Sequence, residues 1–384
     1  MEIVKKVFSL IPLLVVTLNV ASAQNKVTAN GYYKAQMQGL HAAIQQNFYD
    51  KAAGYYTQVA KPEKGKHDYS FLWPICAMLQ AVNEIDKVEP TANLLKPMLT
   101  ILAGYRDPLP PTSGYAEYLW KLRPETRKNT DDTCRYYDDN QWIGITALDA
   151  YATSKKAADR KTYLNLGKEV YKFMMSGYDT VSGGGIYWVE TSKSSKNTCS
   201  NGPGILVALQ LYQATKQKEY LDTALQIYNW TNQKLKAPSG LYYDNINMKS
   251  GRLGKGLLSY NTGTMLQSNV YLYECTGDKK YLKEATAIAD SALTYFYGRN
   301  KFRDGYWFNA VLLRSYQHLL KYNTDTKYII GFKKCLDATL QTEKNDRGLF
   351  AGKGKIHDLV EHGGLLEILA RYALLENKYD LSGA

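Results

Sequence analysis

The segment RYYDDNQW, residues 135–142, places two aspartates side by side among aromatic residues. Aspartate is a favoured helix N-cap, and a first-turn carboxylate interacts well with the helix dipole, so one aspartate here needs no function. Two, Asp138 and Asp139, exceed what capping requires. A pair of carboxyls can also hydrolyse a glycosidic bond, one protonating the leaving oxygen while the other attacks the anomeric carbon or activates water. The residues alone leave both interpretations open.

Two neighbouring carboxyl groups divide the chemistry between them. Like charges resist joint ionisation, which separates the two pKa values. A helix N-terminus favours the charged form of one group, and crowding by tyrosine or tryptophan can keep the other protonated. A short separation between the two carboxyls predicts retention of configuration through a covalent glycosyl-enzyme.

A sugar site also needs aromatic platforms for C–H faces and polar partners for hydroxyls. The candidate platforms, each of which can equally belong to the core, are Trp73, Tyr137, Trp142, Trp188, Tyr260 and Trp307. Trp188 and Tyr260 lie in long loops, which favours a functional role. The candidate hydroxyl partners, for which loop capping is the alternative, are Asn140, Gln141, Asn197, Asn201, Asp244 and Asn261.

No cofactor and no metal is expected. In HDLVEH, His357 and Glu361 are four residues apart and His362 follows, but the zinc helix motif requires His-Glu-x-x-His. Almost no strands are expected, so no glycine-rich phosphate loop follows one. The five cysteines are far apart and lack metal spacing. A disulfide framework is improbable in so large a domain, and the one bridge worth checking is Cys134–Cys199.

The residues around the pair must be positioned by helices, because a helical unit recurs about every 50–60 residues. Each unit has a helix that is apolar all round, such as residues 201–217, followed by an amphipathic helix rich in tyrosine, such as residues 220–231. About six of each kind can be counted. Apolar helices must be buried with amphipathic helices outside them, which predicts an all-α (α/α)6 barrel of six inner and six outer helices. An open solenoid would need capping repeats with a polar outer face, and none is seen.

The loops of this barrel are predicted to be unequal. Turns leaving the inner helices are short, whereas those entering them are long and rich in Gly, Asn, Tyr and Trp. Inner helices of such a barrel run the same way, so the long loops gather at one end. Functional residues concentrate on loops held by a rigid scaffold, and RYYDDNQW enters an inner helix at that end.

The first residues predict export. Two lysines, an apolar run and the small-x-small site Ala21-Ser22-Ala23 are typical of a signal peptide, residues 1–23. The mature chain, residues 24–384, is expected to be a single barrel domain without a membrane anchor, periplasmic or secreted, and monomeric. Its formal net charge of +12 comes from scattered lysines rather than a dense basic run, and export argues further against a nucleic-acid partner.

Several segments carry a resemblance to a known family. YYDDNQWIGITALDAY resembles the signature of glycoside hydrolase family 76, the bacterial endo-α-1,6-mannanases, and GGGIYW with KNTCSNGP, then GLYYDNI with SYNTGT, recur in the order that family uses. The match covers most of the mature chain, and the aspartate motif is fairly specific. The cysteine of KNTCSNGP departs from the family pattern.

The resemblance implies an (α/α)6 barrel that cuts α-1,6-mannan with retention, with Asp138 as nucleophile and Asp139 as acid/base. The expected partner is therefore α-mannan or its oligosaccharides, cut in endo fashion. Two alternatives remain open at this point. One is an (α/α)6 hydrolase for another glycan, and the other is a non-catalytic, exported glycan-binding protein that needs neither aspartate as an acid.

Overall fold

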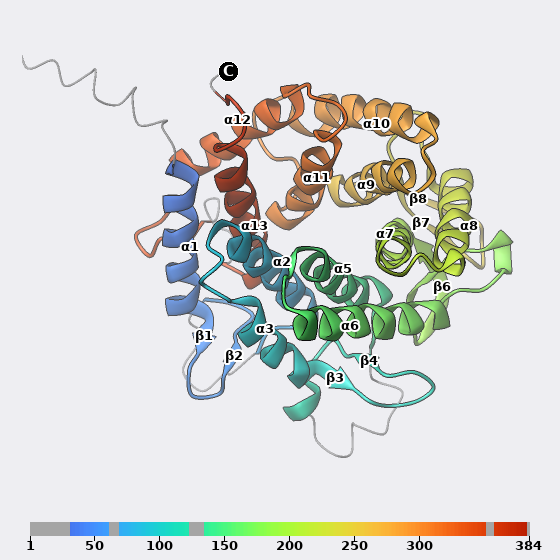
Figure 1. Cartoon of the computed structure of the whole chain (residues 1–384), viewed down its shortest axis with the longest axis horizontal. Coiled ribbons are helices and arrows are strands. Elements are labelled where there is room, and N and C mark those ends of the chain that lie inside the picture. Colours follow the sequence, from blue (N-terminus) through green and yellow to red (C-terminus); the bar gives the residue numbers. More distant parts are fainter. Residues whose placement is uncertain (1–30, 61–68, 123–133, 351–356, 382–384) are drawn as a thin grey trace, which may run out of the picture.

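A computed structural model describes residues 31–60, 69–122, 134–350 and 357–381 (Figure 1). The expected signal peptide, residues 1–23, lies outside these residues. Within them, no helix combines the length and apolar composition that crossing a membrane requires.

Six inner helices form a closed ring in the described residues (Figure 1). They are α2 (Leu72–Val88), α5 (Tyr137–Thr153), α7 (Thr198–Thr215), α9 (Ser259–Thr276), α11 (Tyr306–Leu319) and α13 (Leu359–Leu375). Each packs against the next, and α13 packs against α2 to close the ring. Six helices lie outside the ring: α1 (Tyr32–Phe48), α3 (Leu95–Leu102), α6 (Ala157–Ser176), α8 (Lys218–Leu235), α10 (Lys279–Tyr297) and α12 (Lys327–Thr342). The predicted (α/α)6 barrel is confirmed.

The two kinds of helix differ in how they are buried. In α7, every residue from 200 to 211 is buried, because neighbouring helices surround it. In α8 the buried residues recur as Tyr220, Ala224, Ile227 and Tyr228, one stripe at helical spacing. A helix that is apolar all round is therefore inner, and one with a single stripe is outer.

Close contact between inner helices depends on glycine at two positions. A Cβ on Gly263 of α9 would come within 2.8 Å of the backbone of Leu312 in α11. A Cβ on Gly364 of α13 would overlap the backbone of Trp307 in α11. Interiors are packed too densely to absorb such overlap, so these glycines fix how closely the helices approach.

A buried ion pair spans the inside of the ring. The Arg314 guanidinium of α11 donates to both carboxylate oxygens of Asp149 in α5, at 2.5 and 2.8 Å. It also donates to Gln80 of α2 and Gln267 of α9, and Gln210 of α7 donates to Asp149. Although burial opposes it, the charge of Arg314 holds the pKa of Asp149 below its usual value. The pair thus connects five inner helices.

A second ion pair brings in the sixth inner helix. Arg371 of α13 donates to Glu367 on its own helix at 2.7 Å, lies 3.2 Å from Glu84 of α2, and donates to Gln317 of α11 at 2.8 Å. Together the two polar clusters involve all six inner helices.

The long connections carry a few short strands, whose positions the sequence did not indicate. Two-stranded ribbons are formed by β1 (Tyr49–Asp50) with β2 (Tyr55–Tyr56) and by β3 (Arg106–Asp107) with β4 (Gly114–Tyr115). A four-stranded antiparallel sheet has the order β5 (Tyr187–Val189), β6 (Ser192–Asn197), β7 (Tyr243–Asn247) and β8 (Leu253–Leu257). Short 3-10 turns, η2 (Ala103–Tyr105), η3 (Trp120–Leu122) and η4 (Val181–Gly183), complete the described elements. Polar strands such as SKSSKN lack the apolar alternation that signals a strand.

We expect Asp149→Asn to lower the free energy of unfolding by about 3–5 kcal/mol, because it leaves the buried Arg314 charge without its counter-ion. Denaturant unfolding followed by circular dichroism would measure this. The control is Asp222→Asn, which removes an ion pair with Lys218 in which the side chains are 47% and 80% exposed, and which should cost less than about 1 kcal/mol. Equal losses in the two variants would contradict the importance of the buried pair.

Candidate active site

A cavity of about 560 Å³ opens at one end of the ring. The first turns of all six inner helices reach it, through Trp73, Asp138, Cys199, Tyr260, Phe308 and Val360. The inner helices therefore begin at the same end, where the long connections enter them. The cavity lies at the end of the barrel at which the sequence predicts the site.

Asp138 and Asp139 lie in the first turn of α5 and both line this cavity. The N-cap is Tyr136, which forms no side-chain capping bond. The two aspartates are only 6% and 5% exposed. Burying ionisable groups is costly, so this placement is more than helix capping needs.

The two carboxyl groups have different pKa values. Burial raises the pKa of Asp138 to about 6, and the donor groups of Cys199, of the Asp138 and Asp139 backbone and of Trp188 oppose this rise. Burial, and then the charges of Asp138 and Glu117, raise the pKa of Asp139 well above its usual value. The raised pKa values suit a pair that shares one proton, as acid–base chemistry with two carboxyls requires.

Arg135 fixes the segment that leads into the aspartates. Its guanidinium, 3% exposed, donates to both carboxylate oxygens of Glu190 at 2.5 and 2.6 Å. It also donates to the carbonyls of Leu109 and Thr112 in the β3–β4 connection. Such bidentate pairing is geometrically specific, so two loops are held against the start of α5.

Six of the proposed substrate-binding residues line the cavity: Trp73, Trp188, Asn197, Asp244, Tyr260 and Asn261. Asn261 donates to Asp244 at 3.4 Å. The Oδ1 atoms of Asn197 and Asn261 are buried and have no hydrogen-bond partner among the described residues. Unpaired buried acceptors are costly, and the hydroxyl groups of a bound sugar could satisfy them.

The other six do not line the cavity. Tyr137 packs on Phe173 and against Gly177, on the far side of α5. Asn140 accepts a hydrogen bond from the Tyr115 backbone N–H at 2.8 Å and donates one to the Tyr115 carbonyl at 2.9 Å. Gln141 is fully buried beside Gly204. These side chains pack against or bond to other parts of the protein and do not face the cavity.

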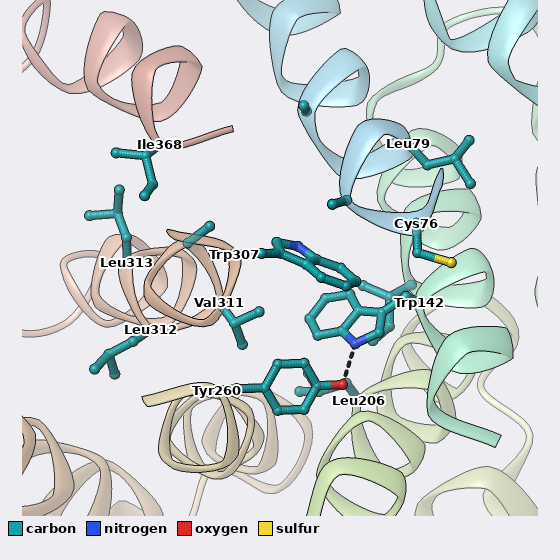
Figure 2. Packing of buried hydrophobic residues seen from close by; sticks show 14 of the residues in the cluster. Cys76, Leu79, Trp142, Leu206, Tyr260, Trp307, Val311, Leu312, Leu313 and Ile368 are labelled. Carbon is teal, nitrogen blue, oxygen red and sulfur yellow. Dashed lines mark hydrogen bonds between the residues drawn. The ribbon is translucent and has the colours of Figure 1, made fainter. Parts of the chain in front are cut away.

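Trp142, Trp307 and Asn201 lie below the cavity floor. The rings of Trp142, Trp307 and Tyr260 meet between the inner helices, and the Trp142 indole donates to the Tyr260 hydroxyl (Figure 2). Trp307 also packs on Trp73, with ring centroids 4.0 Å apart, and thereby supports a residue that lines the cavity. Asn201 accepts a hydrogen bond from the Ile186 backbone N–H at 2.7 Å and donates one to the Ile186 carbonyl at 3.0 Å.

Further residues of the lining were not predicted from the sequence: Gln58, Phe71, Pro74, Glu117, Tyr136, Ser195, Cys199, Asn245, Leu258, Phe308 and Val360. Asn245 could have been found if the sheet had been recognised, because strand register places it opposite Asn197. Nothing in the sequence marks Glu117, which belongs to no motif.

The residues considered for a metal or a disulfide have other partners. His362 contacts the Asp358 carbonyl at 2.6 Å, His357 contacts Asn345, and Glu361 accepts from the backbone of Tyr306. Among the described residues, no group of three or more His, Cys, Asp or Glu side chains could hold a metal ion. Cys134 and Cys199 are free thiols, so the bridge considered between them is not formed in this structure.

Comparison with known protein families identifies the family to which the chain belongs. The model of glycosyl hydrolase family 76 matches residues 116–342, more than half of the 384 residues. A mannan endo-1,6-alpha-mannosidase of Candida glabrata is 26% identical over 171 residues, which is 41% of this chain and 38% of that protein. The matched part therefore spans about two fifths of the curated relative.

Solved structures resemble the whole barrel. A family 76 glycoside hydrolase (mannosidase) from Bacteroides thetaiotaomicron has a TM-score of 0.79 and 25% identity, covering 90% of this chain and 99% of that one. An alpha-1,6-mannanase of Salegentibacter has a TM-score of 0.73 and 22% identity, covering 89% and 99%. The latter structure is of an inactive variant, with two consecutive aspartates replaced by asparagine, in complex with alpha-1,6-mannotriose.

We expect Asn140→Ala to lower the free energy of unfolding by about 1–3 kcal/mol, because the backbone groups of Tyr115 lose their partners in a buried place. Thermal or denaturant unfolding measures this loss. Asn165→Ala, on the exposed face of α6, is the matched control and should stay within about 0.5 kcal/mol. An Asn140→Ala protein of unchanged stability would refute the structural role.

Proposed function

The chain belongs to glycosyl hydrolase family 76, and we propose on this premise that it is a retaining, endo-acting hydrolase of α-1,6-mannosidic bonds in mannan. The observation that carries the proposal is the aspartate pair buried in the wall of the cavity. The names of the relatives supply the substrate class. No cofactor is needed for this reaction.

In the first step, the Asp138 carboxylate attacks the anomeric carbon while Asp139 gives its proton to the glycosidic oxygen. The bond between the anomeric carbon and that oxygen breaks, and the leaving chain departs as an alcohol. The sugar stays attached to Asp138 as an ester, and Asp139 is left as a carboxylate. Its next role, as a base, follows from this change of charge.

In the second step, the Asp139 carboxylate takes a proton from water, and the water oxygen attacks the anomeric carbon. The ester bond to Asp138 breaks, so both carboxyls return to their starting states. Two displacements at one carbon restore its original configuration. The product is a reducing sugar with the anomeric form of the substrate.

The lining suits a mannan chain. Trp73 and Trp188 offer aromatic faces for sugar C–H surfaces, and Trp188 is 40% exposed. Asn197, Asp244 and Asn261 offer acceptors for hydroxyl groups, two of them with buried oxygens that lack a partner. We assign substrate binding to these five residues, and a supporting role to the six candidates that lie outside the lining.

A binding protein would need these platforms but not the aspartate pair. Burying two carboxyls without a counter-ion destabilises a fold, and the cost is intelligible only if their proton is used. The site therefore favours hydrolysis over capture of a glycan.

We further propose export, with cleavage after Ala23, to the periplasm or beyond, and a monomeric single-domain enzyme spanning residues 24–384. N-terminal sequencing of protein purified from the native host should begin at Gln24. A mature protein that keeps Met1 at its start would contradict the leader.

We expect both Asp138→Asn and Asp139→Asn to lose at least about 100-fold in kcat/KM on debranched α-1,6-mannan, because each removes a group that bonds or transfers a proton in the reaction. Wild type should release a ladder of manno-oligosaccharides, and NMR of the first products should show the α-anomer. A folded, wild-type protein that leaves this polymer intact would exclude the substrate, and a β-anomeric first product would exclude retention.

An activated substrate separates the two roles. An aryl α-mannoside with a good leaving group needs no protonation, so Asp139→Asn should regain much of its first-step rate on it while Asp138→Asn stays inactive. Circular dichroism would confirm that both variants are folded. Recovery by Asp138→Asn in place of Asp139→Asn would reverse the assignment.

A further inference from the structure

A second groove lies on the surface beside the last turns of α10, and we call it the α10 groove. Its volume is about 1270 Å³. Its lining comes from α10, from the connection between α10 and α11, and from the connection between α8 and β7. This lining shares no described residue with that of the catalytic cavity, so the groove is a separate feature of the surface.

Three cationic side chains line the α10 groove, and the protein does not neutralise them. They are Arg299, Lys301 and Arg303, and all three are exposed. Among the described residues, no aspartate or glutamate forms an ion pair with any of them. The one acidic residue of the lining, Asp290, already pairs with Lys327 of α12 at 2.9 Å. The groove therefore presents three positive charges to whatever enters it.

Aromatic packing holds the segment that carries these cations. Phe302 is half-buried, and its ring centroid lies 4.9 Å from that of Phe332 in α12. Because Phe302 is anchored toward the protein, its sequence neighbours Lys301 and Arg303 remain on the outer side. The Arg303 guanidinium lies 4.1 Å from the centroid of the Tyr295 ring, a cation–π contact that restricts its position. The charges thus come from an anchored segment rather than from a free loop.

The α10 groove and the catalytic cavity lie at the same end of the barrel. Asp304, next to Arg303, accepts a hydrogen bond from the backbone N–H of Ser259 at 2.6 Å. Ser259 is the first residue of α9, and the next residue, Tyr260, lines the catalytic cavity. The connection between α8 and β7 lines the groove, while β7 itself lines the cavity. One extended chain molecule can therefore reach both places.

We propose that the α10 groove binds an acidic group, a phosphate or a carboxylate, that is carried by the same glycan whose neutral part enters the catalytic cavity. This inference rests on the proposed hydrolase function. The planar guanidinium groups of Arg299 and Arg303 fit the oxygen geometry of both kinds of acid, and Lys301 adds a point charge. The Ser291 hydroxyl in the lining can donate to the same oxygens.

The size and the rings of the groove favour a glycan over other anions. Its volume of about 1270 Å³ exceeds the 560 Å³ of the catalytic cavity, which leaves room for sugar units beside the acid. Single-stranded nucleic acid binds by stacking its bases on free aromatic rings. Phe296 is buried, Phe302 packs on Phe332, and Arg303 covers Tyr295, so the lining offers no such ring.

The first test measures binding of debranched α-1,6-mannan to the Asp138→Asn protein by calorimetry. The polymer is used unmodified, lightly phosphorylated or lightly carboxymethylated. At low salt we expect the acidic forms to bind about tenfold more tightly, and 0.5 M salt should remove most of this difference. Adding Arg299→Gln, Lys301→Gln and Arg303→Gln should reduce the affinity for the acidic forms to that for the neutral polymer. The acidic form that binds more tightly identifies the acid.

The matched control carries Lys155→Gln, Lys156→Gln and Lys161→Gln, which change the net charge equally at exposed positions around the turn between α5 and α6. It should keep the preference for the acidic polymer. Equal binding of acidic and neutral mannan, an equal loss in the control, or competition by DNA at the same phosphate concentration would overturn the proposal. Circular dichroism and unchanged affinity for neutral mannan would show that the variants are folded.

A second measurement does not depend on the catalytic cavity. Mannose 6-phosphate, compared with mannose, should shift the NMR signals of residues 291–303 in wild type, and the substitutions at Arg299, Lys301 and Arg303 should abolish the shifts. If these shifts occur while wild type leaves neutral α-1,6-mannan intact, the proposed function fails and the acid site stands. Hydrolysis of neutral mannan without the shifts means that the function stands and the acid site fails.

Discussion

The buried pair of Arg314 and Asp149 is the interaction on which the barrel depends. These residues come from α11 and α5, which lie opposite each other in the inner ring, and glutamines of α2, α7 and α9 complete their hydrogen bonds. An ion pair of this kind offers little net stability compared with apolar packing, but it permits one arrangement of helices. Since the partners cannot be satisfied if a helix slides or rotates, the network specifies the register of the ring. The apolar core alone would tolerate such movement.

The aspartate pair lies nearer to the N-terminal ends of the inner helices than this network does. The network residues stand eight to twelve positions after the start of their helices, about 12–18 Å along the axis at the rise of an α-helix. The rings of Trp142, Tyr260 and Trp307 pack against one another beside the cavity, which Tyr260 lines (Figure 2). In the network each buried charge has a partner of opposite sign, whereas the cavity wall buries two acids side by side. A site so unfavourable for folding persists because the rigid ring below holds it, as is usual for strained functional sites.

The helix order and the alternation of inner and outer helices followed from the sequence, because burial on one face or on all faces leaves a strong periodic pattern. The individual site residues followed less well. Trp73 and Trp142 look alike as tryptophans near the start of inner helices, yet one lines the cavity and the other lies beneath it. That difference is decided by helix rotation of a fraction of a turn, which no single residue type reports. Glu117 and Cys199 were not predicted because only the folded chain brings them into the cavity lining. The polar sheet was not predicted because its strands lack an apolar face.

The four-stranded sheet joins two loops that are far apart along the chain. β5 and β6 belong to the connection between α6 and α7, while β7 and β8 belong to that between α8 and α9, and the two hairpins are held together by the pairing of β6 with β7. Neither hairpin can therefore be exchanged by itself without leaving an unpaired strand edge. Loops of a barrel are usually regarded as independent modules that evolution or an engineer may replace one at a time. Here the two connections form one sheet, and a chimera that alters specificity at this wall has to transplant both.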